Sequence, residues 1–144
     1  MNTEQNKSIL EFTNPVLKRA IFQPNPKFDK KNSKNIKMNL KTSNSGIDTK
    51  LEYHSSDVVL TVTNISSDDS LSSNEDPFVL IVSMAARFRW PESTPKDVEE
   101  SFVRTNAPSL LLSYIRPLVS NITGLSEFGI QNIPFIDFTN SIED

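Results

Sequence analysis

Cysteine is absent from this chain of 144 residues, and its single histidine is His54. Without cysteine there can be no disulfide, no thiolate metal site and no cysteine nucleophile. One histidine leaves a histidine-based zinc site or a Ser-His relay without the partners that such sites need. Three glycines do not form either of the glycine-rich loops that bind nucleotide phosphates. We therefore expect a protein that is not an enzyme and that uses no cofactor and no metal.

Long hydrophobic runs are absent as well. No stretch approaches the roughly 18 apolar residues that a membrane-spanning helix needs, and the first residues, MNTEQNKSILEF, lack the apolar centre of a signal peptide. We therefore expect a cytoplasmic protein without membrane insertion. Lysines gather between Lys27 and Lys41, which would suit a phosphate-binding patch, but such clusters are more commonly solvated surface. With a net charge of only −3, no nucleic-acid partner is expected.

The first half of the chain contains three strand patterns. Residues 16–23 should form a strand that stops at Pro24, because proline cannot donate a hydrogen bond to a neighbouring strand. Residues 57–65 are rich in β-branched side chains, and a start near Leu51 also fits. Residues 36–41 alternate strictly between apolar and polar, with an apolar face made by Ile36, Met38 and Leu40.

Residues 78–90 form the longest predicted strand. Every second side chain is apolar, and these positions should face the core: Phe78, Leu80, Val82, Met84, Ala86, Phe88 and Trp90. The opposite face is apolar only at its start, at Val79 and Ile81. A strand this long should bend, and Ala85-Ala86 is the expected place.

Helices are predicted after the strands. Thr94 suits the N-cap of a helix that ends near Arg104, and a second helix should begin at Asn106-Ala107-Pro108. Apolar side chains recur along the second helix at helical spacing, at Leu111, Tyr114, Ile115, Leu118 and Ile122. Pro117 should kink this helix and Gly124 should cap its end. A tail over residues 130–138 should be extended, with one further helical turn through Ile142.

Strands followed by helices predict an α+β fold with one domain over residues 1–144. The expected architecture is a four-stranded antiparallel sheet with a long C-terminal helix and short flanking helices. Residues 1–9 and 66–76 are polar, and we expect them to be flexible.

Polar residues do not form an evident catalytic cluster in the sequence. Glu99 and Glu100 are adjacent acids expected on a solvated surface, and His54 lies in a polar stretch that also predicts exposure. Arg116 is the one charge in the apolar stripe of the long helix, beside Tyr114. It suits either a hydrogen-bonded pair or a side chain whose charged end reaches water.

Apolar side chains exceed what one sheet and one helix need. Several of the nine phenylalanines lie at segment ends, the Val79 and Ile81 face has no predicted cover, and the helical stripe is wide. Such surfaces indicate an oligomer or a site that binds other polypeptides.

Two C-terminal segments carry a distinctive pattern. Residues 106–116 are Asn-Ala-Pro-Ser-Leu-Leu-Leu-Ser-Tyr-Ile-Arg, with a proline at the start of the expected helix and a Tyr-x-Arg further along. Residues 131–138 are Gln-Asn-Ile-Pro-Phe-Ile-Asp-Phe. The two segments resemble the long helix and the Asn-Leu-x-Pro-x-Asn-Phe segment of the SecB family of tetrameric export chaperones. The three earlier strands match at the level of pattern, so that the resemblance covers most of residues 10–142.

The resemblance implies a dimer of dimers that holds unfolded polypeptides or preproteins in surface grooves without ATP. The residues that it places at the client-binding groove are Phe28, Ile36, Met38, Leu40, Phe88, Trp90 and Ile142. The residues that it places at the interface between subunits are Leu111, Tyr114, Ile115, Leu118 and Ile122.

The chain departs from the family at the surface that meets the export motor SecA. The family presents acidic residues there, whereas the matching positions here are Arg19, Gln23 and Ile81. We therefore expect that SecA does not bind through this face. SecB-like chaperones also occur beside toxin–antitoxin pairs, so a partner-specific chaperone for an antitoxin is the alternative function.

Overall fold

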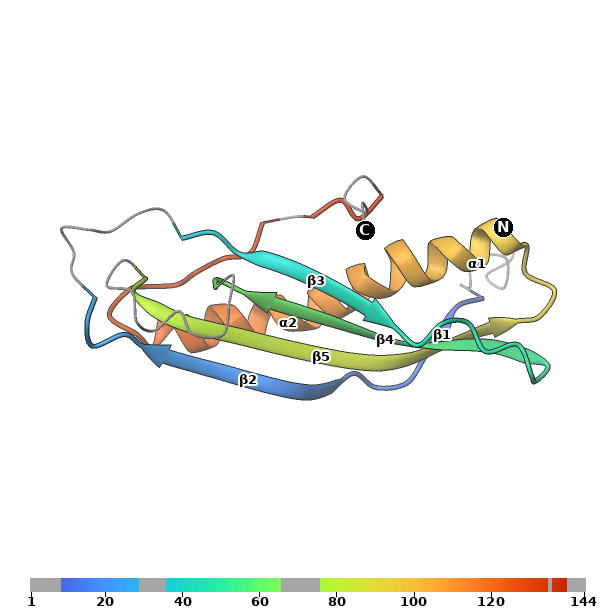
Figure 1. The fold of residues 1–144 in the computed structure, drawn as a ribbon, viewed down its shortest axis with the longest axis horizontal. Helices are drawn as coiled ribbons and strands as arrows, with labels where there is room; N and C mark the ends of the chain where they lie inside the picture. Colours follow the sequence, from blue (N-terminus) through green and yellow to red (C-terminus); the bar gives the residue numbers. More distant parts are fainter. Residues whose placement is uncertain (1–8, 29–35, 66–75, 135, 140–144) are drawn as a thin grey trace, which may run out of the picture.

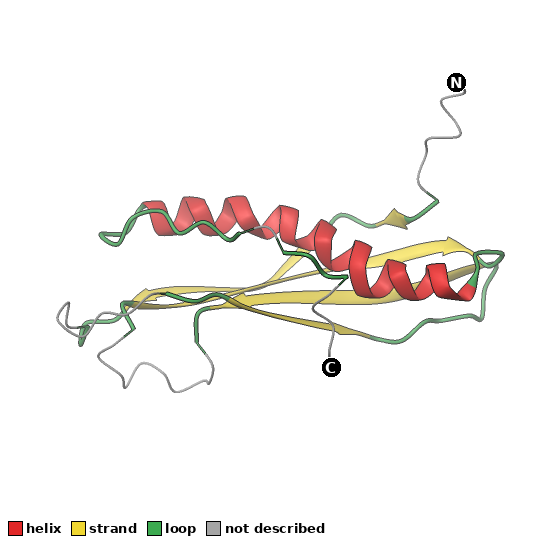
Figure 2. Cartoon of the chain, turned by 90° about the horizontal axis from the view of Figure 1, so that it is seen from above, coloured by secondary structure: helices red, strands yellow, loops and turns green. Residues whose placement is uncertain are grey.

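Five antiparallel strands and one helical run make up the fold in the computed structural model, which describes residues 9–28, 36–65, 76–134 and 136–139 (Figure 1). The strands are β1 (Glu11–Phe12), β2 (Val16–Pro24), β3 (Asn39–Asn44), β4 (Tyr53–Thr63) and β5 (Phe78–Pro91). The helical run consists of α1 (Lys96–Ser101), the π-helical η4 (Phe102–Asn106) and α2 (Ala107–Gly124). Figure 2 shows the helical run as a layer along one face of the sheet. The predicted α+β class is confirmed.

The sheet is built around β5. One edge of β5 pairs with β4, and the other pairs with β2 and then with β1. Between β1 and β2 the chain stays beside β5, because the N–H of Thr13 donates to the carbonyl of Arg87 and Thr13 Oγ1 accepts the N–H of Arg87. β1 and β2 pair with the same edge of β5, one after the other along its length. Any line drawn across the sheet therefore crosses at most four strands. The two residues of β1 are too few to show alternation, so the sequence does not predict them.

Most strand boundaries follow the sequence. β2 ends at Pro24 as predicted, and β4 begins at Tyr53, close to the earlier of its two expected starts. β3 begins at Asn39, three residues after the predicted start, because Asn39 is already opposite the last residue of β4, Thr63. The bend in β5 is expected at Ala85-Ala86. Close to this point the pairing of β2 with β5 shifts its register, between Leu17 and Arg19 of β2.

The helical run differs from the prediction of two separate helices. η4 joins α1 to α2 without a break, and Pro108 lies in the first turn of α2. The wider π turn accommodates a proline ring that would clash with the carbonyl four residues earlier in a regular helix. The predicted N-cap at Thr94 is wrong, since Pro95 holds that position and no side chain caps the helix. α2 continues through Pro117.

Gly124 is the last residue of α2, and Leu125 follows it as the C-cap, so the predicted glycine cap is wrong. The glycine has a different role. A Cβ at this position would lie 3.0 Å from Cγ1 of Ile130, so its absence lets the tail approach the end of the helix closely.

The main core lies between the sheet and the helix. All seven apolar positions predicted for the inner face of β5 are buried, and Leu111, Ile115 and Val119 of α2 are fully buried against them. Two tail residues, Ile133 and Phe138, complete this core. The described part of the tail contains no further helix or strand, and Ile142 lies outside the described residues.

Residues 1–8 and 66–75, on which the expectation of flexibility mainly falls, also lie outside the described residues. None of the described helices is both long and apolar enough to cross a membrane.

Candidate functional site

Three predicted groove positions lie along the free side of the sheet. Ile36 and Met38 precede β3 and Leu40 lies in it, and all three are half-buried apolar side chains that pack on the main core. Within the described residues β3 pairs only with β4, so its other edge presents backbone groups outward. An unpaired edge beside apolar side chains is the geometry to which an extended peptide can add as a strand.

Phe28 lies near a different part of the molecule, where the end of β2 meets the start of the tail. Its ring packs edge-to-face on Phe128, with centroids 5.8 Å apart. The two rings line a hollow of about 300 Å³ together with Pro24, Asn25, Pro26 and Glu127. Phe28 is therefore partly accessible, and Phe128 is a neighbour that the resemblance does not identify.

Phe88 and Trp90 do not line a surface. Both side chains are 0% exposed and belong to the main core beneath the helical run. Their alternation with Arg87 and Arg89 places them on the inner face of β5, so the strand pattern that marks them as apolar marks them as core. The burial contradicts a client-binding role for these two residues.

The predicted interface residues divide into two groups. Leu111 and Ile115 are 0% exposed because they face the sheet of their own chain, which contradicts an intersubunit role for them. Leu118 and Ile122 are half-buried, and Tyr114 is 44% exposed. These last three are the predicted positions that remain accessible to a second chain.

A buried polar cluster joins α1 to the sheet. Oε2 of Glu99 accepts a hydrogen bond from the indole N–H of Trp90 at 2.6 Å and lies 2.5 Å from Nδ1 of His54. His54 and Trp90 are directly opposite each other on β4 and β5. Glu99 is only 7% exposed, so the expectation that His54 and Glu99 are solvated surface groups is wrong. The available signal was Trp90 itself, because a tryptophan on a core face needs an acceptor for its N–H.

The ionisation of Glu99 follows from these contacts. Burial favours the neutral acid, but hydrogen bonds from Trp90 and His54 and the electrostatic attraction of His54 and Lys96 outweigh it, so the pKa of Glu99 is lowered. A lowered pKa in the folded chain means that ionised Glu99 stabilises the fold above its ordinary pKa of about 4.3. This contribution disappears as the pH falls through the lowered pKa.

We expect Glu99→Gln to flatten the acid dependence of stability. In the parent chain the urea midpoint should fall as the pH drops below about 5, and part of that slope should be missing in the variant. Glu100→Gln, which changes the exposed neighbour, is the matched control and should retain the parent slope. If the urea midpoint of Glu99→Gln depends on pH as steeply as that of the parent, ionised Glu99 does not stabilise the fold.

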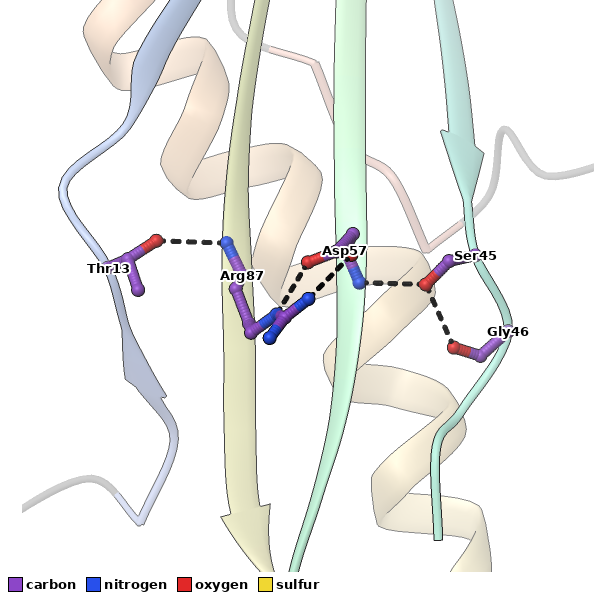
Figure 3. Close-up of polar contacts among 5 residues, drawn as sticks. All are labelled: Thr13, Ser45, Gly46, Asp57 and Arg87. Carbon is purple, nitrogen blue, oxygen red and sulfur yellow. Dashed lines mark hydrogen bonds and ion pairs between the residues drawn. The ribbon is translucent and has the colours of Figure 1, made fainter. Parts of the chain in front are cut away.

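A line of polar contacts crosses the other face of the sheet (Figure 3). Asp57 of β4 and Arg87 of β5 form a two-bond ion pair, with Nε–Oδ1 and Nη2–Oδ2 distances of 2.8 and 3.2 Å. The hydrogen bond from Arg87 lowers the pKa of Asp57. Thr13 and Ser45 extend the line to both sides, because their hydroxyl oxygens accept the backbone N–H groups of Arg87 and Asp57. Side-chain oxygens therefore complete the backbone hydrogen bonding where β2 and β3 no longer reach.

A second hollow, of about 600 Å³, lies beside β1. Its apolar part includes Phe12, which is 43% exposed and packs against Phe88. Its charged part includes Arg89, whose Nε lies 2.6 Å from Oε1 of Glu11 and whose guanidinium lies over the ring of Tyr53. Both arginines that line this hollow are paired within the chain, Arg89 with Glu11 and Arg87 with Asp57.

Comparison with known proteins identifies the fold. No protein-family model matches the sequence, and no curated protein matches it. A protein of unknown function from Streptococcus agalactiae superposes with a TM-score of 0.59 at 14% identity, over 88% of this chain and 97% of that one. The SecB-like chaperone Rv1957 of Mycobacterium tuberculosis, in complex with a ChAD peptide from the HigA1 antitoxin, superposes with a TM-score of 0.52 at 12% identity, over 88% and 90% of the two chains. The chain has a SecB-like fold.

Proposed function

We propose that this protein is a SecB-like chaperone that holds unfolded polypeptides on an apolar surface without ATP. The observation that carries the proposal is the SecB-like fold, since the structural neighbour from Mycobacterium tuberculosis has a bound antitoxin peptide. The half-buried apolar side chains beside the free edge of β3 support it from this chain's own residues. No catalytic activity and no cofactor are part of the proposal.

Along β3 the proposed client surface consists of Ile36, Met38 and Leu40. Phe28, which lies beside the end of β2, is proposed as a separate apolar contact for the same client. Half-buried apolar side chains can bind apolar side chains of many sequences, while the backbone edge of β3 binds the peptide main chain. Ile142 stays a proposed member of the surface, although it lies outside the described residues.

Met38→Asp should weaken the binding of an unfolded client by about 1–3 kcal/mol, because it places a charge where an apolar contact forms. Isothermal titration with an unfolded polypeptide measures the loss. Met38→Leu conserves the apolar volume and should bind as the parent does. If Met38→Asp unfolds the chain instead, Met38 is a core residue and does not belong to the surface.

The alternative proposal is a chaperone dedicated to one partner, such as an antitoxin. The antitoxin peptide bound to the structural neighbour favours this possibility specifically. Affinity for many unrelated unfolded proteins would support the general chaperone, and affinity for one partner only would support the dedicated one. Affinity capture from the native host, followed by titration of each captured protein, distinguishes the two.

We further propose a cytoplasmic homotetramer, a dimer of dimers, in which the exposed side of α2 meets a second chain. Tyr114, Leu118 and Ile122 would contribute to this interface. Their accessibility supports it, since each presents apolar surface that its own sheet does not fully cover.

SecA should not bind through the sheet face that faces away from the helix. Arg19 and Gln23 are exposed on β2, and Ile81 of β5 is buried in an apolar cluster with Ile65 and Val79. A basic partner that is attracted by acidic residues would meet an arginine here, and like charges at an interface cost several kcal/mol. Calorimetry with SecA from the same host should show no heat of binding. Micromolar binding that Arg19→Ala abolishes would contradict this proposal.

A further inference from the structure

We propose that α1 is a latch that Glu99 holds against the sheet, and that it opens about η4 while the sheet stays folded. The inference concerns the chain alone and does not depend on the proposed function. It follows from three features: the way in which α1 is held, the geometry of the turn that follows it, and the groups that it covers.

The hold on α1 is polar. Glu99 is the one buried residue of this six-residue helix, so a carboxylate stands where a surface helix ordinarily has an apolar anchor. One atom of that carboxylate, Oε2, contacts both strands, through Trp90 on β5 and His54 on β4. Losing Glu99 therefore releases α1 and leaves the buried indole N–H without its acceptor.

The hinge is the π turn. η4 separates α1 from α2, and its bonding pattern is one that helices adopt in single turns, commonly at functional positions. The two sides of the turn are anchored differently. α2 presents Leu111, Ile115 and Val119 to the core with no exposed surface, so opening at η4 leaves α2 in place. A segment with few buried apolar contacts opens at lower free energy than the core beside it.

Two buried hydroxyl groups of the closed chain are unsatisfied in the part that the structure describes. Ser56 Oγ and Thr94 Oγ1 are buried without a hydrogen-bond partner among the described residues. Ser56 lies on the same face of β4 as His54, two residues further along, and Thr94 lies in the turn that leads into α1. Buried hydroxyls without partners favour an open state in which water reaches them. Thr94 stands in the turn next to α1, so its buried hydroxyl narrows the free-energy difference between the closed and the open state.

Opening would expose an aromatic pair. The indole of Trp90 is 0% exposed in the closed chain, and its ring centroid lies 5.6 Å from that of Phe102 in the first turn of η4. Moving α1 away removes Glu99 from the indole N–H and disturbs the ring contact with Phe102, the residue that follows α1. Trp90 is therefore the residue whose environment reports the state of the latch.

Trp90 is also the single tryptophan, so its fluorescence reports the latch without interference. Acrylamide quenching should be weak in the parent chain and at least about threefold stronger in Glu99→Ala, which removes both hydrogen bonds. Glu100→Ala makes the same change at the exposed neighbouring position and should quench as the parent does. If Glu99→Ala folds and Trp90 is as shielded as in the parent, the proposal fails.

Hydrogen exchange separates local opening from general loss of stability and applies to the unaltered chain. Amides of α1, residues 96–101, should exchange at least about tenfold faster than those at the centres of α2 and β5, whereas Val103 of η4 is anchored in the main core. The difference should widen in Glu99→Ala, with β5 unchanged. Equal protection of α1 and β5 in the parent chain would overturn the latch, whether or not the variant folds.

Discussion

Replacing Trp90 by alanine is expected to lower the free energy of unfolding by about 3–5 kcal/mol. The side chain is fully buried, packs on Phe102, and donates its N–H to Glu99. The variant therefore creates a large cavity and removes one of the two hydrogen bonds that hold a buried carboxylate. Urea unfolding followed by circular dichroism measures the loss without depending on tryptophan fluorescence.

Two further variants test the reason for that loss. Trp90→Phe retains most of the aromatic ring but loses the N–H that donates to Glu99. It should lower the free energy of unfolding by about 1–3 kcal/mol, because the buried carboxylate then lacks one of its two donors. Tyr53→Ala removes a partly exposed aromatic side chain on the other face and should cost less than Trp90→Ala. A Trp90→Ala chain that keeps its stability but loses client binding would restore the groove role that the resemblance assigns to Trp90.

The second large effect is expected at the outer side of α2. Leu118→Glu should convert the proposed tetramer into dimers or monomers, because an uncompensated carboxylate buried between chains costs several kcal/mol. Light scattering coupled to size exclusion measures the mass directly. Leu118 also packs on the main core of its own chain, so circular dichroism must show that the variant is folded before its mass is interpreted.

Thr49→Glu adds the same charge at an exposed position in the connection between β3 and β4 and should leave the mass unchanged. A parent chain that is monomeric at micromolar concentration would rule out the tetramer. A dissociated chain that keeps its client affinity would show that assembly and binding are independent.

The sheet could be predicted from sequence because its signals are local. Pro24 ends β2 by removing a backbone donor, and the alternation along β5 predicts all seven positions of the core face correctly. On the opposite face Val79 and Ile81, expected without cover, are buried in a second apolar cluster. The boundary of β3 could not be predicted in the same way, because it depends on where the partner strand ends. β1 is defined by its pairing with β5, since two residues carry no periodicity of their own.

The functional surface could be predicted only in part. Periodicity identifies Leu111 and Ile115 as apolar, but it does not say whether their own sheet or a second chain covers them. The resemblance places Trp90 at a groove, whereas the alternation along residues 78–90 assigns it to the core face, where it is fully buried. Contacts between distant segments decide these cases.

The buried cluster shows the limit most clearly. Glu99 and His54 are 45 positions apart and each stands in a polar stretch, so neither predicts the other. They meet because β4 and β5 align His54 with Trp90, and because α1 then directs Glu99 to the same point. The resemblance of the C-terminal segments identified the fold correctly, but it carries no information about this cluster.

The proposed chaperone function is tested most directly by the aggregation of a chemically unfolded protein on dilution, followed by light scattering in the absence of ATP. Equimolar parent chain should suppress the aggregation and remain bound to the client, and Met38→Asp should suppress it less. Aggregation that proceeds at the same rate with or without the folded parent chain, for several unrelated clients and for the antitoxin of the native host, would contradict the function proposed for this protein.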